Sequence, residues 1–307
     1  MISELAPAKV NLFLHVGARR DDGFHPLQSL AVFTGEGPAA DRLSLSEADG
    51  IGLRLDGPFA PGLQAEQDNL VLRAARLLRE RAPGAMGVAM TLTKNLPVAS
   101  GIGGGSSDAA AALRGLRILW DLAIDDAVLA ELGGNLGSDV PVCVAARPAF
   151  MEGRGEILTP LVVMPRLSML LVNPGVPVPT SPVFAALNTR RGVDMTLPKG
   201  GFGDTGDLLR FLESTGNDLE EPARRLQPVI GHVLDAIAAQ PGALLTRMSG
   251  SGATCFGLFA DDDCCVRASA AIAQAHPGWW CAAGFVPSRG HAEEVLGQDI
   301  GPTPDGL

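Results

Sequence analysis

Residues 97–112 read PVASGIGGGSSDAAAA, and this stretch decides the fold. Glycine fills four of the five positions from Gly101 to Gly105, which predicts neither helix nor stable strand there. Residues 106–120 are rich in helix formers, so a helix is predicted with Ser106 or Ser107 as its N-cap and Asp108 in its first turn. Glycines in front of a helix N-terminus let backbone N–H groups converge, so the stretch predicts a phosphate site. A plain flexible loop is the alternative.

Two better-known phosphate motifs fit this stretch less well. The P-loop pattern needs a lysine after the glycines, and none is present. The dinucleotide pattern G-x-G-x-x-G is matched by Gly101 and Gly103, but Ser106 stands at its third glycine. Asp121 lies near the position of the acidic residue in that pattern, yet no βαβ alternation continues the motif. A dinucleotide-dependent oxidoreductase stays open as an alternative.

Upstream of the glycines, short apolar runs alternate with turn signals. The stretch Lys9–Val16 alternates as a strand does. Residues 43–45 and 51–55 predict a hairpin around Asp49 and Gly50, because an Asp-Gly pair favours a tight turn. Helical spacing over residues 69–81 predicts a helix capped by Asp68 or Asn69, and residues 88–92 predict a strand.

Downstream, the pattern restarts near residue 160. We therefore expect an α+β chain with a domain at 1–160, a second domain at 161–290 and a loose tail at 291–307. The expected helices are residues 126–133, 208–212, 219–226, 229–239 and 267–275. The expected strands are residues 167–172, 244–248 and 254–259.

Composition excludes several classes of partner. The chain has 307 residues, 46% of them hydrophobic, and a formal charge of −10, which disfavours binding to nucleic acid or to an anionic membrane. Any phosphorylated ligand must therefore be held by a local site. Five cysteines without a C-x-x-C pair predict reduced thiols. The N-terminal residues lack the apolar core of a signal peptide, so we expect a cytoplasmic protein.

Three segments, in chain order, resemble the motifs of the GHMP small-molecule kinases. They are PAKVNL at residues 7–12, the glycine-rich stretch at 97–112, and MSGSGA at 248–253. The resemblance implies an α+β, two-domain GHMP kinase fold, with an N-terminal ribosomal-protein-S5-domain-2-like domain and a C-terminal ferredoxin-like domain. It also implies an ATP-dependent kinase for a small alcohol, working as a monomer or weak homodimer.

The resemblance assigns residues to ATP and to catalysis. Asp139 would accept the proton of the acceptor hydroxyl, with Lys9 beside it. Mg²⁺ is expected with ATP, although the sequence shows no carboxylate cluster dedicated to a metal. Residues implied in nucleotide binding are Asn69, Pro97, Val98, Ala99, Ser100, Gly101, Ile102, Gly103, Gly104, Gly105, Ser106 and Ser107. From the residues alone, Asp139 could instead be a turn residue or helix cap, and Lys9 a solvated charge.

Further segments narrow the acceptor. DGFHPL at 22–27, LGSDVP at 136–141 and NDLE at 217–220 resemble family members whose small-molecule substrate is a cytidine-diphosphate-linked methylerythritol. The implied substrate-binding residues are Asn11, Phe24, His25, Lys94 and Phe184. Phe24 departs from the usual tyrosine, which puts a hydroxyl contact in doubt but keeps an aromatic face for stacking.

Three questions stay open at this stage. The chain could phosphorylate homoserine, mevalonate or a sugar instead, or be a non-catalytic nucleotide-binding protein on the same fold. The Gly250–Gly252 turn could face the cleft and hold substrate phosphates, or only join two strands tightly.

Overall fold

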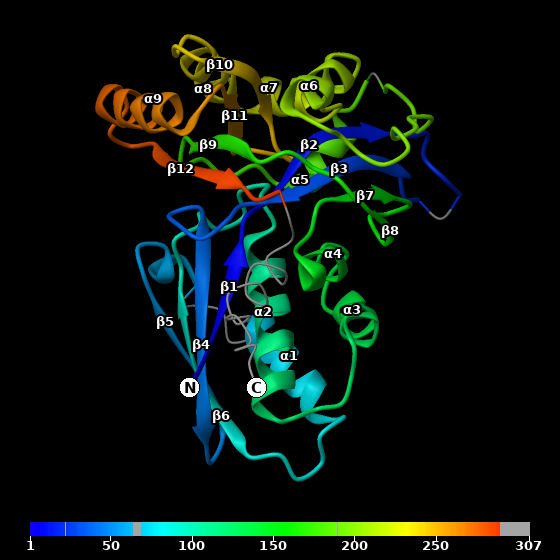
Figure 1. Cartoon of the computed structure of the whole chain (residues 1–307), viewed down its shortest axis with the longest axis vertical. Coiled ribbons are helices and arrows are strands. Elements are labelled where there is room, and N and C mark those ends of the chain that lie inside the picture. The colour runs from blue at the N-terminus through cyan, green and yellow to red at the C-terminus, as the bar shows by residue number, and fades with distance from the viewer. Residues whose placement is uncertain (22, 64–68, 189, 289–307) are drawn as a thin grey trace, which may run out of the picture.

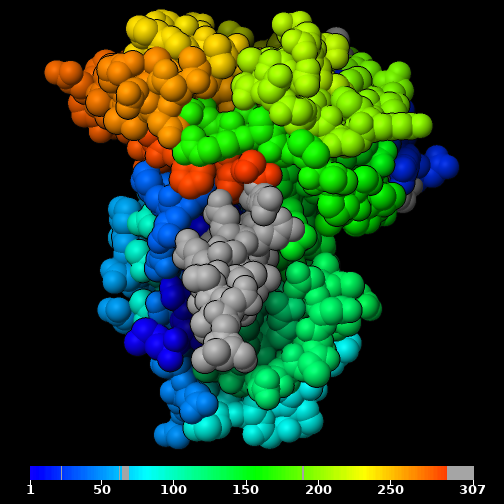
Figure 2. All heavy atoms as spheres, viewed as in Figure 1, coloured from blue at the N-terminus to red at the C-terminus, as the bar shows by residue number. Residues whose placement is uncertain are grey.

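The computed structural model describes residues 1–21, 23–63, 69–188 and 190–288. Two halves are stacked along the long axis of the molecule (Figure 1). The lower half is a sheet with helices packed on one side of it. The upper half combines two further sheets with the remaining helices, and β12 (Trp280–Val286) runs along the junction (Figure 2).

The lower half is built on a four-stranded sheet in the order β1-β4-β6-β5. Apolar side chains of these strands pack against the helices to form one buried core. Its strands are β1 (Ile2–Pro7), β4 (Ala40–Ala48), β5 (Ile51–Asp56) and β6 (Gly87–Thr93). Its helices are η1 (Ala60–Leu63), α1 (Leu70–Arg79), α2 (Gly104–Leu119), α3 (Asp126–Gly134) and α4 (Val140–Ala145).

The predicted hairpin around Asp49 and Gly50 is wrong. Both strands exist, but β6 lies between them and pairs antiparallel with β4 and parallel with β5. Parallel neighbours need a crossover connection instead of a tight turn. The segment from η1 through α1 supplies it, so the Asp-Gly pair only marks where the chain leaves β4.

The start of α2 also differs from the prediction. The helix begins at Gly104, two residues before Ser106, and Gly103 is its N-cap with φ +64° and no side-chain capping bond. The left-handed φ explains the glycine, because it strains other residues. Asp108 consequently lies inside the helix, where it is buried. Asn69, by contrast, caps α1 as predicted by accepting a hydrogen bond from Val71 N.

The upper half contains two four-stranded sheets, ordered β2-β3-β7-β8 and β10-β11-β9-β12. Helices α8 and α9 pack on the second sheet, at the top of Figure 1. The other strands here are β2 (Lys9–Val16), β3 (Leu27–Phe33), β7 (Ala149–Glu152), β8 (Ile157–Pro160), β9 (Leu167–Asn173), β10 (Ala243–Met248) and β11 (Cys255–Phe259). The helices are α5 (Thr180–Ala185), α6 (Thr205–Glu213), α7 (Glu220–Leu226), α8 (Val229–Ala238) and α9 (Asp262–Ala275).

One hydrophobic core crosses the predicted boundary at residue 160. It joins Val10 and Leu30 from the first sheet of the upper half to Met169 and Phe256 from the second. The division into 1–160 and 161–290 stays a prediction. Because β2 belongs to this shared core and continues the chain from β1, it connects the two halves directly.

Two further expectations concern the chain as a whole. All five cysteines are free thiols, as the sequence predicted. In the part of the chain that the structure describes, no helix combines the length and the apolar character needed to cross a membrane. The predicted loose tail at 291–307 lies outside the described residues.

Candidate active site

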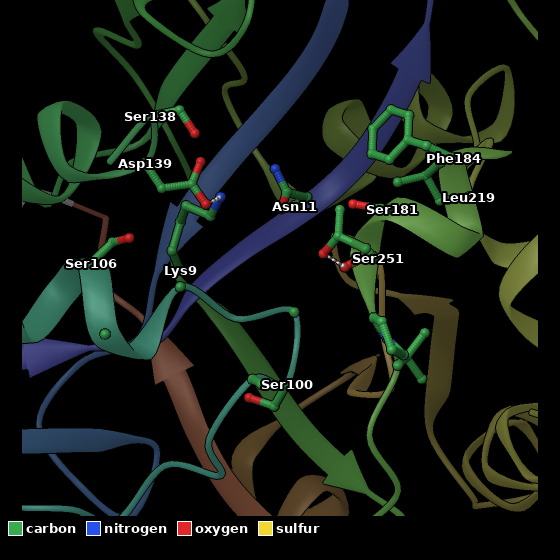
Figure 3. Close-up of a pocket in the computed structure, with 18 of the residues that line it drawn as sticks. Lys9, Asn11, Ser100, Ser106, Ser138, Asp139, Ser181, Phe184, Leu219 and Ser251 are labelled. Atoms are coloured by element: carbon green, nitrogen blue, oxygen red, sulfur yellow. Dashed lines mark hydrogen bonds and ion pairs between the residues drawn. The ribbon is translucent and has the colours of Figure 1, made fainter. Parts of the chain in front are cut away.

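A large cleft lies where the two halves meet. Its volume is about 1350 Å³, more than the 300–1000 Å³ or so of a typical site for one small molecule. Lys9, Asp139, Ser138 and Ser106 lie on one side of it, Phe184, Ser181 and Ser251 on the other, and Asn11 between them (Figure 3). The cleft therefore has room for two ligands side by side.

The glycine-rich stretch forms one wall of the cleft. At Gly103 a Cβ atom would lie 3.1 Å from Cβ of Lys9, and at Gly104 it would lie 3.4 Å from Nζ of Lys94. The first N–H groups of α2 have no partner within the helix and carry the positive end of its dipole. The wall is consequently a cradle for an anionic group.

Most residues predicted for nucleotide binding line this cleft, with two exceptions. Ile102 is fully buried in the hydrophobic core and reaches Lys9 N only through its carbonyl oxygen. Ser107 is fully buried, and its hydroxyl has no hydrogen-bond partner among the described residues. Because α2 starts earlier than predicted, Ser106 faces the cleft and Ser107 faces away from it. Ser107, which the resemblance placed in nucleotide binding, therefore does not face the cleft, and that assignment is corrected to a buried position in α2.

The second glycine turn, at residues 249–252, packs directly on the first. The Ser249 hydroxyl accepts a hydrogen bond from Asn11 N at 3.1 Å and donates one to the Gly101 carbonyl at 3.0 Å. At Gly101 a Cβ atom would lie 2.6 Å from Ser249 O, so only glycine fits. The turn joins β10 to β11 and also exposes Gly250 and Ser251 to the cleft, so it does more than join two strands. That it holds substrate phosphates stays a prediction.

Asn217 holds this second turn in place. Its side-chain amide donates to the carbonyl oxygens of Met248 and Gly250, both at 2.8 Å. The neighbouring Asp218 carboxylate accepts a hydrogen bond from Val16 N at 2.8 Å, at the end of β2. The NDLE segment therefore ties the turn to the strand that carries Lys9 and Asn11.

Lys9 and Asp139 form an ion pair at the floor of the cleft. The distance from Lys9 Nζ to Asp139 Oδ2 is 2.7 Å, with 5% of the lysine side chain and 36% of the aspartate side chain exposed. Asp139 stands at the N-cap of α4, but its side chain makes no capping bond. The carboxylate is thus directed to Lys9 and to the cleft, and the reading of Lys9 as a solvated charge is excluded.

Aromatic residues gather at the other end of the cleft. The ring centroids of His25 and Phe184 are 5.9 Å apart, and His25 Nδ1 lies 3.0 Å from the Gly17 carbonyl oxygen. Phe24 also lines the cleft and is 53% exposed. Between this end and the ion pair, Asn11 is buried and donates to the Ser29 hydroxyl at 2.7 Å. This end offers flat apolar faces and a few polar groups.

Lys94 is not placed as predicted. Its ammonium is buried beside Gly104 and forms ion pairs with Asp41 and, at 2.7 Å, with Asp108. Burial alone would lower the pKa of Lys94, but the two carboxylates outweigh it and raise that pKa. The assignment of Lys94 to a base edge is therefore corrected to an internal charge behind the phosphate cradle.

The same cluster holds one more carboxylate than ammonium. Burial raises the pKa of Asp108 to about 7, although Lys94 opposes that shift. Asp41 Oδ1 accepts hydrogen bonds from the backbone N–H groups of Asn95 and Leu96, whereas Asp108 Oδ1 has no partner among the described residues. Asp108 is therefore the carboxyl that takes up a proton near neutral pH.

Several polar residues of the cleft were missed from the sequence. Most of them come from loops outside any motif, whereas Thr180 and Ser181 begin α5 and Ser138 lies in the LGSDVP segment. Arg19 follows β2, Arg154 lies between two glycines at the β7–β8 turn, and the Thr180 hydroxyl lies 3.0 Å from that of Ser251. The remaining ones are Ser138, Ser181 and Arg190. Two local signals were available: the glycines that flank Arg154 and the LGSDVP segment that contains Ser138.

Comparison with known proteins gives a consistent set of matches. The family description "GHMP kinases N terminal domain" matches residues 69–147, and "GHMP kinases C terminal" matches residues 196–276. A protein of Parvibaculum lavamentivorans named 4-diphosphocytidyl-2-C-methyl-D-erythritol kinase is 49% identical, over 91% of this chain and 96% of its own. One of the same name from Methylobacterium radiotolerans is 50% identical, over 93% and 99% respectively.

Solved structures agree with these matches. The crystal structure of a 4-(cytidine 5'-diphospho)-2C-methyl-D-erythritol kinase superposes with a TM-score of 0.75 at 35% identity, covering 93% of this chain and 100% of the other. Homoserine kinase from Cytophaga hutchinsonii superposes with a TM-score of 0.70 at 19% identity, covering 94% and 95%. At that identity the second likeness concerns the fold alone.

Proposed function

The chain belongs to the GHMP kinase family, and from this premise and the geometry of its cleft we propose that it phosphorylates 4-diphosphocytidyl-2-C-methyl-D-erythritol. The phosphoryl group comes from ATP and is transferred to the 2-hydroxyl of the acceptor. This is a step of non-mevalonate isoprenoid precursor synthesis. Relatives of that name are 49% and 50% identical to this chain over 91% and 93% of its length.

The observation that carries this proposal is the Lys9–Asp139 ion pair in front of the glycine cradle. Lys9 occupies one carboxylate oxygen, Oδ2, at 2.7 Å. The other oxygen is left to accept the proton of a hydroxyl. A nucleotide-binding protein without catalysis has no use for a lysine-held carboxylate beside a phosphate site, so the pair favours a kinase.

The residues divide the reaction among them. Asp139 takes the proton from the acceptor hydroxyl. As it does so, the oxygen of that hydroxyl forms a bond to the γ-phosphorus of ATP. The bond between that phosphorus and the bridging oxygen breaks, and ADP leaves. Lys9 fixes the orientation of the carboxylate and adds positive charge where charge builds up on the transferred group. Asn11 lies beside this pair and limits where the hydroxyl can sit.

The glycine cradle fits the triphosphate of ATP. Ser106 and the backbone N–H groups of residues 103–105 would hold it, and a Cβ atom at Gly103 would intrude on Lys9. Mg²⁺ accompanies ATP in this proposal and neutralises part of the phosphate charge. Among the described residues there is no group of three metal-binding side chains, so its ligands would come mainly from the phosphates.

The aromatic end fits the cytidine. Phe24 and Phe184 offer ring faces for stacking on a base, and His25 a polar group for its edge. Homoserine, mevalonate and simple sugars have no base to place there. We also propose that the protein works in the cytoplasm, where ATP is supplied and free thiols persist, as a monomer or weak homodimer.

ADP release by the purified protein tests the function. The acceptors are 4-diphosphocytidyl-2-C-methyl-D-erythritol, homoserine, mevalonate and galactose, each with Mg²⁺ and ATP. We expect turnover with the first acceptor alone. Turnover with a different acceptor would support a kinase but contradict the proposed acceptor. No turnover with any of the four would favour a non-catalytic binding protein.

Two variants test the proposed base in the same assay. Asp139→Asn keeps the shape of the side chain but cannot accept the proton, so kcat should fall by about 10²–10⁴ with little change in either KM. Asp235→Asn makes the same change on the exposed side of α8 and should leave kcat as it is. A fully active Asp139→Asn variant would overturn the assignment.

A further inference from the structure

Phe24 sits at the mouth of the cleft in the loop between β2 and β3. The loop is closed by hydrogen bonds from Gly17 N to Pro26 O at 2.7 Å and from Arg20 N to Phe24 O at 2.8 Å. The residue as a whole is 53% exposed. A phenylalanine ring has no hydrogen-bonding group, so its orientation depends on contacts with its faces and edges.

One of those contacts comes from Arg154. The central carbon of its guanidinium lies 3.8 Å from the centroid of the Phe24 ring, well within the range of a cation–π contact. Both side chains line the cleft. The guanidinium covers one face of the ring, which directs the stacking of a ligand to the opposite face.

The backbone places Arg154 on a turn that is anchored beside the loop of Phe24. It lies at the tip of the β7–β8 hairpin between Gly153 and Gly155, whose φ angles of +72° and +109° suit glycine. The hairpin is fastened beside the loop, because Leu27 N donates to Gly153 O at 2.7 Å and Gln28 Nε2 donates to Glu152 Oε1 at 3.0 Å. Arg154 therefore approaches Phe24 from a short turn that is fastened to the sheet on both sides.

Resting on the proposed function, we propose that Arg154 is a positioning residue for the base of the acceptor: its guanidinium holds the Phe24 ring so that a pyrimidine stacks on the opposite face. An immobilised ring loses less conformational freedom when the base binds. Base–aromatic stacking and cation–π contacts are of comparable strength, so the guanidinium makes a measurable difference. Arg154 thereby contributes to the preference for a nucleotide-linked alcohol over a simple one.

Steady-state kinetics give the first test, in the protein with Phe24 intact. We expect Arg154→Met to raise KM for the cytidylated acceptor by about five- to thirty-fold, the range that corresponds to a cation–π contact of about 1–2 kcal/mol. KM for ATP and kcat at saturating acceptor should change less than about two-fold. Arg154→Lys should recover part of the loss. Arg210→Met removes an exposed positive charge on α6 and should change none of these values.

The absence of tyrosine from the chain gives a second, direct test. Phe24→Tyr introduces one tyrosine, whose ring resonances after ¹³C-tyrosine labelling report this place alone. Titration with cytidine diphosphate should shift those resonances, with a larger Kd when Arg154→Met is added. Titration with ATP reports whether nucleotides in the cradle affect the same ring, and it should leave the resonances nearly unchanged.

The outcomes separate this inference from the function on which it rests. In one outcome, cytidine diphosphate shifts the resonances while Arg154→Met changes neither the Kd for cytidine diphosphate nor the KM for the acceptor. That outcome refutes the role of Arg154 and leaves the proposed acceptor standing. If cytidine diphosphate never affects the new tyrosine, no base stacks at Phe24, and the inference falls together with the cytidine site. A parallel loss of affinity for ATP in Arg154→Met would mean general disruption and would also refute it.

Discussion

At the scale of single residues, the proposed chemistry depends on Lys9 holding one oxygen of Asp139. We expect Lys9→Met to lower kcat by about 10²-fold or more, because the carboxylate loses its fixed partner and the transferred group loses a nearby charge. Steady-state kinetics measure this. Arg225→Met breaks an exposed ion pair with Glu221 and serves as the control. An unchanged kcat in Lys9→Met would show that the pair is structural only.

A second residue-scale prediction concerns the buried carboxyl of Asp108. Its pKa is raised to about 7 by burial, against 3.8 for a free aspartate. The folded state therefore binds a proton that the unfolded state has released, and this group's contribution to the free energy of unfolding is lost as pH rises from about 4 to about 7. Asp108→Asn removes that loss. Relative to the parent, the variant should gain stability between pH 5 and pH 8.

Urea unfolding at both pH values measures that difference. Lys94 and Asp41 face Asp108 in both proteins. Their effects on the free energy of unfolding therefore largely cancel when the variant is compared with the parent. Asp49→Asn at an exposed site is the control and should show a difference that hardly varies with pH. If the stability of Asp108→Asn relative to the parent also stays constant between pH 5 and pH 8, Asp108 is ionised over that whole range.

The sequence predicts single residues where they belong to a motif. Lys9, Asn11 and Asp139 were assigned this way, and the structure brings them together in one cleft. Lys94 was misplaced because its partners, Asp41 and Asp108, are far from it in the chain. The contact between Arg154 and Phe24 joins residues 130 positions apart, and no local pattern encodes such a contact.

At the scale of elements, the two glycine turns act as one unit because their backbones touch. Gly101 has φ +78°, and a Cβ atom there would lie 2.6 Å from Ser249 O and 2.8 Å from Gly252 N. Gly101→Ala should therefore destabilise the fold and raise KM for ATP several-fold or more. Thermal unfolding and steady-state kinetics measure the two effects.

Gly105→Ala is the matched control for stability. Gly105 lies in the first turn of α2, and its added Cβ would meet nothing closer than 3.5 Å. Alanine favours helix over glycine by about 1 kcal/mol at most, so this variant should unfold at the same temperature as the parent or slightly above it. Equal losses in the two variants would contradict the argument from backbone contact.

Local patterns predict most elements but not their pairing. Asn69 caps α1 because asparagine accepts backbone N–H bonds in any context. The hairpin failed because an Asp-Gly pair permits a tight turn without requiring one, and β6 could enter only from later in the chain. Strand β12, which was not predicted, is mixed in exposure and is fixed by pairing with β9.

At the scale of the whole molecule, the two halves are held together by the chain that runs from β1 into β2 and by one core. In that core Leu96 and Ile102, from the stretch that leads into α2, pack with residues of the upper half. The resemblance to GHMP kinases implied two domains, but it gave no sign that Val10 and Leu30 would share a core with Met169 and Phe256. Such sharing depends on how sheets pack, which no sequence window contains. The aromatic contact between Phe59 and Trp280, with ring centroids 6.4 Å apart, adds a further link between the halves.

This shared core predicts a single cooperative unfolding transition. The three tryptophans can test it, because Trp120 ends α2 in the lower half while Trp279 and Trp280 lie in the upper half. Trp120→Phe leaves fluorescence from the upper half alone, and Trp279→Phe combined with Trp280→Phe leaves it from the lower half alone. After correction for each variant's stability by far-ultraviolet circular dichroism, both fluorescence midpoints in urea should coincide with the loss of secondary structure. If the two halves unfolded at separate midpoints, the packing of Leu96 and Ile102 into this core would contribute little. The cleft would then join two independently stable domains instead of one cooperative body.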